Sequence, residues 1–168
     1  ILRAAKKNIN NMGGRPEGAS TITQQVAKNF FLSREISYKR KIKEILLALR
    51  IEQILDKNRI LELYLNQIYL GFRSYGVAAA SLNYFNKSLN ELNISEAAYL
   101  AALPKAPNNY HPIRKKKAAL ARRNWVIKRL RQERIITEQK ALIATNTELI
   151  TIERPELKPV EAQYFLED

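Results

Sequence analysis

Apolar residues recur at helical spacing through most of the chain, and this pattern limits the fold to helices packed on helices. Within residues 37–55, four apolar positions follow the i, i+3, i+4, i+7 rule: Ile42, Ile45, Leu46 and Leu49. Other sides of this segment are apolar too, so we expect a buried helix. Strand-like alternation occurs only in residues 148–157, which proline interrupts. The sequence therefore predicts an all-α fold.

Further helices are predicted by capping residues and by glycine and proline. One begins at Ser20 or Thr21 and ends near residue 32, and another follows Asp56 and ends near Gly71. Asn93 and Glu96 make a capping-box-like start to a helix in "ISEAAYLAAL", which Pro104 and Pro107 end. Three more helices are expected in residues 75–85, 118–130 and 138–144.

The chain is strongly basic, with 29 Lys and Arg against 16 Asp and Glu and a net charge of +13. Such a charge favours anionic partners: nucleic acid, anionic lipid headgroups or a phosphorylated substrate. Charge alone does not choose among them. The chain has no cysteine and one histidine, His111. Disulfides and thiolate sites are therefore excluded, and imidazole zinc sites and Ser-His-Asp triads nearly so.

The first polar group that core packing does not require lies at the start of the helix after Gly18. It comprises Ser20, Thr23, Gln24 and Lys28, within the opening two turns. A helix N-terminus presents unpaired amides and a positive dipole, which suit a phosphate or sugar hydroxyls. The alternative is that Ser20 only caps the helix and the glutamines are solvated.

The second group surrounds Glu44, which lies in the apolar helix of residues 37–55. Arg40 and Lys41 precede it by one turn on its own side. A carboxylate in such a helix must be paired with cations or take up a proton. Two interpretations stay open: an ordinary intrahelical pair of Arg40 with Glu44, or a catalytic carboxylate beside cations that hold an anionic leaving group.

Four segments resemble, in order and spacing, four of the five signature blocks of the family 51 glycosyltransferases. They are "GASTITQQVAKN", "RKIKEILLALRIE", "ILELYLNQIYLGFRSYGVAAASLNYF" and "SEAAYLAALPKAPNNYHP". The resemblance covers residues 1–125. It implies a lysozyme-like all-α domain of a class A penicillin-binding protein, on the outer or periplasmic face of the bacterial cytoplasmic membrane. The implied reaction polymerises lipid II into glycan strands and releases undecaprenyl pyrophosphate.

The resemblance also implies roles for eight residues. Glu44 matches the second acidic residue of the site, which helps to hold the leaving pyrophosphate. Lys28 and Lys43 match phosphate ligands. The donor sugar and phosphate positions are matched by Ser20, Gln24 and Gln25, and the paired basic residues by Arg40 and Lys41. No cofactor is required, although a divalent cation, Mg²⁺ or Mn²⁺, is compatible with the pyrophosphate.

The implied partners are lipid II, the growing lipid-linked glycan and an anionic membrane surface. Phosphoglycolipid inhibitors of the moenomycin type are expected to bind the intact domain. Nucleic acid is not expected as a partner. Phe30, Phe31 and Leu32 are either core or an exposed apolar rim that enters the bilayer.

Two departures from the family pattern affect the expected site. The first signature block, which supplies the general-base glutamate, is absent, so we expect a chain truncated at both ends and inactive alone. Ile36 stands where relatives often have a phosphate-binding arginine, a loss for which Arg34 or Lys39 would compensate. The predicted glycosyltransferase domain spans residues 1–150, and residues 151–168 begin a linker toward an absent transpeptidase domain.

The main alternative function is a basic helical nucleic-acid-binding module, favoured by the net charge and by "RKKK" at residues 114–117. The sequence, however, offers neither an aromatic stacking sheet nor zinc-ligand spacing. A third alternative is a non-catalytic membrane-surface scaffold that keeps the fold.

Overall fold

The computed structural model describes residues 20–32, 35 and 37–152, and its regular elements are helices. The described residues contain no strand beyond one isolated antiparallel bridge between Tyr69 and Tyr75. The all-α prediction is confirmed. The chain divides into two compact units. The first runs to Tyr69 and includes Tyr75–Val77, and the second holds Leu70–Ser74 and the chain from Ala78 onward.

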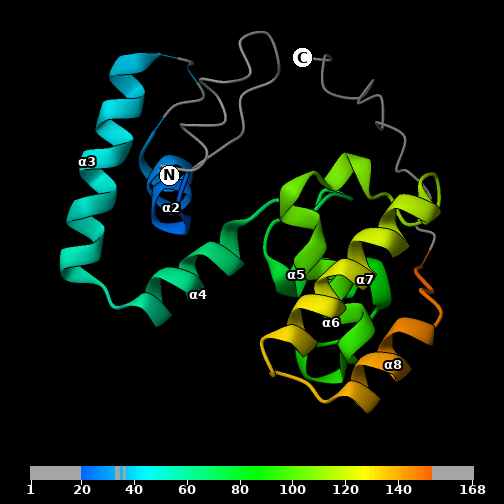
Figure 1. Ribbon diagram of the computed structural model, residues 1–168. Helices are drawn as coiled ribbons and strands as arrows, with labels where there is room; N and C mark the ends of the chain where they lie inside the picture. The colour runs from blue at the N-terminus through cyan, green and yellow to red at the C-terminus, as the bar shows by residue number, and fades with distance from the viewer. Residues whose placement is uncertain (1–19, 33–34, 36, 153–168) are drawn as a thin grey trace, which may run out of the picture. The chain divides into compact units, whose positions relative to one another are not determined.

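The first unit contains α2 (Ile22–Phe31), α3 (Tyr38–Ile54) and α4 (Lys57–Gln67), labelled in Figure 1. Each helix begins after a residue whose side chain accepts a backbone N–H of the first turn: Thr21, Ser37 and Asp56. The predicted starts of these helices are confirmed. The last one ends at Gln67, short of the predicted end near Gly71.

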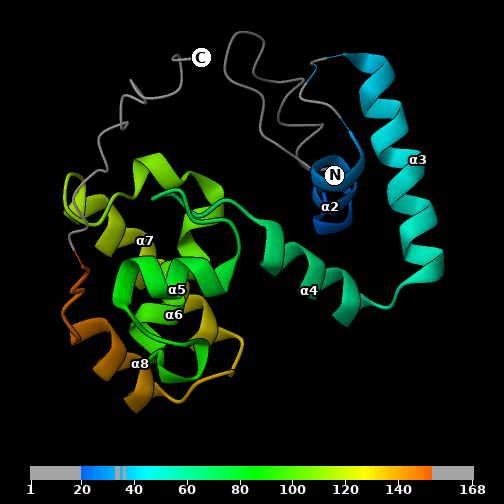
Figure 2. The same ribbon diagram turned by 180° about the vertical axis from the view of Figure 1, so that it is seen from behind.

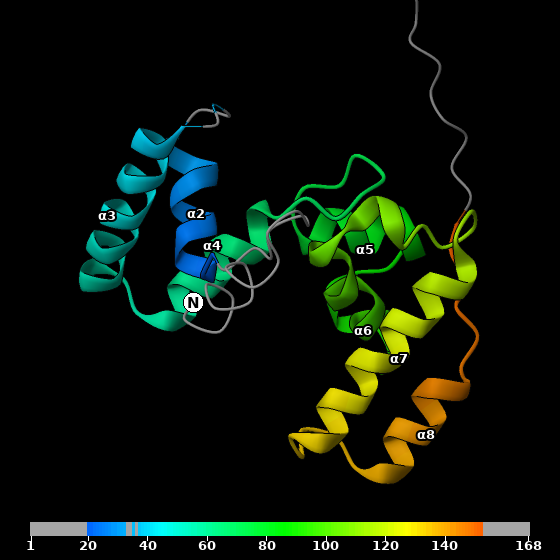
Figure 3. The same ribbon diagram turned by 45° about the horizontal axis from the view of Figure 1, so that its top comes forward.

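The prediction that α3 is a buried helix is wrong. Its two buried residues are Glu44 and Ala48, one turn apart. The four apolar residues used for the prediction are 41 to 61% exposed. Among the described elements α3 packs along one ridge against α2 and α4, as Figure 3 shows, and these two neighbours do not surround it. Apolar residues on its other sides remain at the surface.

The second unit contains α5 (Val77–Phe85) from its second residue onward, α6 (Ile94–Ala102), α7 (Lys116–Gln132) and α8 (Glu138–Asn146). Short 3-10 helices lie at Leu89–Glu91, Leu103–Lys105 and Pro107–Asn109. The capping box of Asn93 and Glu96 is confirmed. α7 packs against both α6 and α8, which also contact each other (Figure 2). Their contact forms a core of four residues: Ala98, Ile127, Ala141 and Ala144.

A tight turn follows α4, and the position of Gly76 in this turn requires a glycine. Its φ is +83°, and a Cβ at this position would lie 2.5 Å from the backbone oxygen of Asn66. Both the left-handed backbone and the close approach exclude a side chain. The strand-like pattern of residues 148–157 produces no strand in residues 148–152, and residues 153–157 lie outside the described part of the chain.

Candidate active site

The start of α2 is closed by Thr21 and Gln24, which form a reciprocal capping box. The N–H of Gln24 donates to Thr21 Oγ1 at 3.1 Å, and the N–H of Thr21 donates to Gln24 Oε1 at 3.2 Å. Thr21 is therefore the cap, and Ser20 is not needed for this role. The Ser20 hydroxyl instead accepts a hydrogen bond from Lys41 Nζ at 2.9 Å.

Glu44 is 2% exposed and is held by two cations of its own helix. Arg40 Nη1 donates to Glu44 Oε2 at 2.9 Å, and Lys41 Nζ donates to the other carboxylate oxygen. The predicted intrahelical pair of Arg40 with Glu44 is thus present. Because Lys41 also contacts Ser20, one ammonium group joins the start of α2 to the buried carboxylate of α3.

A cavity of about 270 Å³ lies beside this carboxylate, lined by Ser20, Gln25, Lys28 and Glu44. These residues come from the start of α2, its body and α3. Lys28 is exposed and contributes a positive charge, whereas Arg40 and Lys41 already balance the charge of Glu44. The cavity therefore favours an anion that also accepts hydrogen bonds.

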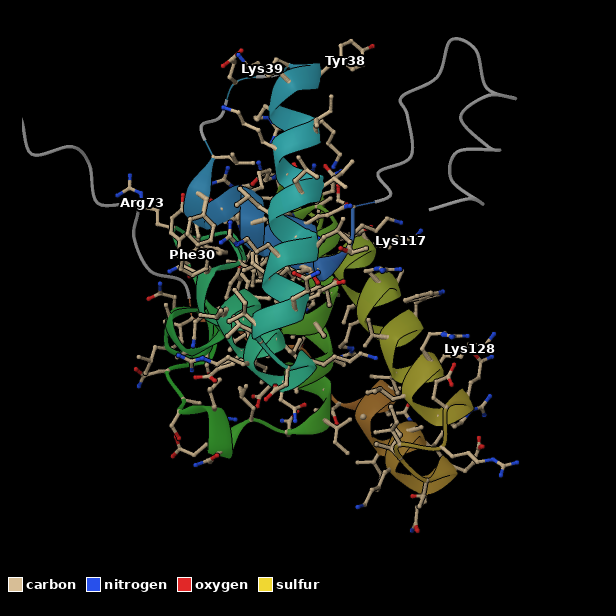
Figure 4. The ribbon with its side chains drawn as sticks, turned by 90° about the vertical axis from the view of Figure 1, so that its left-hand side faces the viewer. Phe30, Tyr38, Lys39, Arg73, Lys117 and Lys128 are labelled. Carbon is tan, nitrogen blue, oxygen red and sulfur yellow. The ribbon has the colours of Figure 1, made fainter. Side chains whose placement is uncertain are left out.

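A second cavity of about 620 Å³ lies between the end of α2 and the start of α3. Its cations are Lys39, Arg40 and Lys43, and its apolar side consists of Phe31 and Leu32. Figure 4 shows Lys39 and Tyr38 at the outer end of α3. Lys43 lines this cavity and not the first one, so the predicted phosphate ligands Lys28 and Lys43 lie in two separate cavities.

Arg40 links the two cavities, since it lines the second and pairs with a carboxylate of the first. Its Nε is buried and has no hydrogen-bond partner among the residues that the structure describes. A buried donor without a partner is rare, and a bound anion would satisfy it. Arg40 therefore keeps an unsatisfied donor while it holds Glu44.

Gln24 lines neither cavity, because it is buried within the capping box, and its contact with substrate stays a prediction. Of the residues considered for the arginine missing at Ile36, Lys39 lines the second cavity, whereas Arg34 and Ile36 lie outside the described residues.

One contact of the site was missed by sequence reasoning. Thr23 Oγ1 donates to Glu52 Oε1 at 2.6 Å, which joins α2 to α3. The sequence pattern places Thr23 in the polar helix start but does not identify its partner. A signal existed, because Glu52 follows Glu44 and Ala48 at intervals of four residues, on the ridge that faces α2.

This chain is similar to known proteins of one family. A model of the family described as Transglycosylase matches residues 1–131. Penicillin-binding protein 1A of Rickettsia prowazekii is 47% identical over 99% of this chain and 22% of the relative. The protein of the same name from Escherichia coli is 52% identical over 89% of this chain and 17% of the relative, and the one from Aquifex aeolicus is 52% identical over 99% and 23%.

A crystal structure of penicillin-binding protein 1A from Haemophilus influenzae resembles this chain with a TM-score of 0.55 and 33% identity. The alignment covers 84% of this chain and 18% of that one. The predicted lysozyme-like glycosyltransferase fold is confirmed by this similarity. This chain spans about a fifth of the length of these relatives. On the match over residues 1–131 and these identities, the chain belongs to the transglycosylase family.

Proposed function

We propose that this chain forms the glycan-polymerising domain of a peptidoglycan synthase. Its substrate is lipid II together with the growing lipid-linked glycan, and its by-product is undecaprenyl pyrophosphate. The observation that carries the proposal is the buried carboxylate of Glu44, held by Arg40 and Lys41 beside a cavity lined by Lys28. Membership of the transglycosylase family supports it.

In the proposed reaction, this part of the chain stabilises the leaving group. The 4-hydroxyl of the acceptor sugar forms a bond to the anomeric carbon of the donor, and the bond from that carbon to the diphosphate oxygen breaks. The electron pair stays with the diphosphate, whose negative charge increases. Cations fixed before the reaction stabilise this charge without reorganising. Arg40 and Lys41 are such cations, because Glu44 fixes both, and Lys28 adds a positive charge to the cavity.

The acceptor must also lose a proton, and Glu44 is poorly placed to take it. Its two oxygens already accept hydrogen bonds from Arg40 and Lys41, so the carboxylate is engaged in holding these cations. We therefore assign Glu44 to the leaving-group side of the reaction. The general base belongs to the first signature block of the family.

The donor set at this site does not fit a metal held by the protein alone. Among the described residues, no three His, Cys, Asp or Glu side chains gather in one place, and Glu44 is already paired. Mg²⁺ prefers several oxygen ligands. We propose that the diphosphate is held by lysine and arginine, and that any divalent cation arrives bound to the diphosphate itself.

Polymerisation tests the proposal directly. A longer chain that adds the first signature block upstream of Ile1 is expected to convert lipid II into glycan and to release undecaprenyl pyrophosphate. The products are measured by gel separation of labelled glycan and by chromatography of the lipid. A moenomycin-type phosphoglycolipid is expected to inhibit the reaction. Salt-sensitive binding of the chain to random DNA, with no affinity for lipid II, would instead support a nucleic-acid-binding module.

We further propose that the domain works against the outer face of the bacterial cytoplasmic membrane. None of the described helices is both long and apolar enough to cross a bilayer. At the end of α2, however, Phe30 is 43% and Phe31 63% exposed, with ring centroids 6.1 Å apart. Phe31 also lines the cavity that contains Lys39 and Arg40. An apolar surface beside cations suits the boundary between acyl chains and anionic headgroups.

Liposome flotation tests this membrane contact. The double variant Phe31→Ser and Leu32→Ser is expected to reduce binding to anionic vesicles by about ten-fold, since withdrawing a phenylalanine from an apolar medium costs roughly 1.5–3 kcal/mol. Leu142→Ser is the control, because Leu142 is equally exposed, at 63%, on α8. Unchanged flotation of the double variant would remove the membrane role of α2.

A further inference from the structure

A hydrogen bond between α2 and α3 lies away from the cations of the site. The hydroxyl of Thr23, in the first turn of α2, donates to a carboxylate oxygen of Glu52, in the last turn of α3, at 2.6 Å. Thr23 is 6% exposed, so its hydroxyl has little access to water. A buried hydroxyl requires a partner within the protein, and Glu52 provides it.

A second hydrogen bond joins the same two segments near the other end of α3. Lys41, in the first turn of α3, donates to the Ser20 hydroxyl at 2.9 Å. Lys41 and Glu52 are separated by roughly 16 Å along the helix axis at 1.5 Å per residue. Packing already holds α2 against α3 and α4. The two hydrogen bonds, toward opposite ends of α3, add directional contacts that set where the start of α2 lies along α3.

The position of α2 determines the geometry of the first cavity. Gln25 and Lys28 follow Thr23 on the same short helix and line the cavity from one side. Glu44 lines it from α3, the helix that also carries Glu52. A displacement of α2 at Thr23 therefore moves Gln25 and Lys28 relative to Glu44.

We propose that Thr23 and Glu52 are positioning residues for the diphosphate site. They touch no substrate, and their hydrogen bond holds α2 where Lys28 and Gln25 face the carboxylate of Glu44. The inference rests on the proposed function, because the ligand of the cavity is taken to be a lipid diphosphate. It adds to that function the contact that aligns the two halves of the site.

Binding of farnesyl diphosphate to the 168-residue chain, measured by calorimetry, tests the inference. Thr23→Val keeps the shape of the side chain and removes the donor, and we expect about ten-fold weaker binding, which is 1.4 kcal/mol. Glu52→Ala removes the acceptor and should have the same effect. Thr23→Ser and Glu52→Gln keep a donor and an acceptor, so their affinity should stay within about two-fold of the original.

Two further variants separate positioning from general stability. Val26→Ala creates a cavity under α2 and lowers the free energy of unfolding without touching the hydrogen bond. We expect its affinity for farnesyl diphosphate to stay nearly unchanged. The double variant Thr23→Val with Glu52→Ala should bind no more weakly than either single variant, because both remove one interaction.

In the longer chain, Thr23→Val is expected to lower kcat/KM for lipid II by about ten-fold, with Thr23→Ser restoring it. Equal affinity of Thr23→Val and the unchanged chain for farnesyl diphosphate would overturn the positioning role alone. Losses of affinity in Thr23→Ser and Val26→Ala as large as the loss in Thr23→Val would do the same. An unchanged chain with no affinity for farnesyl diphosphate would overturn the proposed function, and this inference with it.

Discussion

Replacing Glu44 by glutamine in the longer, polymerising chain is expected to lower kcat/KM for lipid II by at least about 100-fold, the loss typical of a removed electrostatic group in an active site. Glutamine has nearly the same shape but carries no charge. Arg40 and Lys41 would lose the anion that fixes them, and the amide NH₂ would present donors to another donor. The cations would then be less ordered when the diphosphate leaves.

Glu62→Gln is the matched control for this experiment. Glu62 pairs with Arg59 at 2.7 Å on α4, at i+3, but both side chains are 54% exposed. An exposed pair contributes little, so this variant should keep its activity. Circular dichroism would establish that both variants are folded. Near-normal glycan product from Glu44→Gln would remove Glu44 from the mechanism.

The local features of the site were predictable because each depends on residues close in sequence. Thr21 caps α2, Ser37 caps α3, and Arg40 reaches Glu44 across one helical turn. Such contacts follow from the helical period alone. The family resemblance supplied the rest of the expected site, and its residue roles beyond these contacts stay predictions.

The features that sequence reasoning missed depend on packing between helices. Apolar content suggested that α3 is buried, but burial is set by how many neighbours a helix has, and α3 exposes Leu46 and Leu49. The separation of Lys28 and Lys43 into two cavities follows from the crossing of α2 and α3. Periodicity along one helix does not contain this information.

Arg123 is the clearest example of a residue whose role the sequence conceals. It lies in a run of basic residues, a pattern that indicates a helix face exposed to solvent. Figure 4 shows Lys117 and Lys128 of the same helix at the surface. Arg123 itself is 2% exposed. Its guanidinium donates to Ser95 Oγ, Asn124 Oδ1 and the backbone oxygens of Thr145 and Thr147, at 2.7–2.9 Å.

These contacts place a positive charge at the C-terminal end of α8. The carbonyls of Thr145 and Thr147 belong to the last turn and cap of that helix, where backbone acceptors lack intrahelical partners and the dipole is negative. Burial lowers the pKa of Arg123, although an arginine remains charged at neutral pH. One side chain thus joins α6, α7 and α8.

We expect Arg123→Met to lower the free energy of unfolding of the second unit by about 3–5 kcal/mol, because it leaves buried acceptors without a donor. Trp125, the only tryptophan of the chain, lies two residues away on α7, so its fluorescence during urea unfolding reports on this unit. Arg122→Met is the control. Arg122 stacks on Trp125 at 4.0 Å, a contact worth about 0.5–1 kcal/mol at an exposed site. Similar losses in the two variants, measured by fluorescence and by circular dichroism, would show that Arg123 does not hold the three helices together.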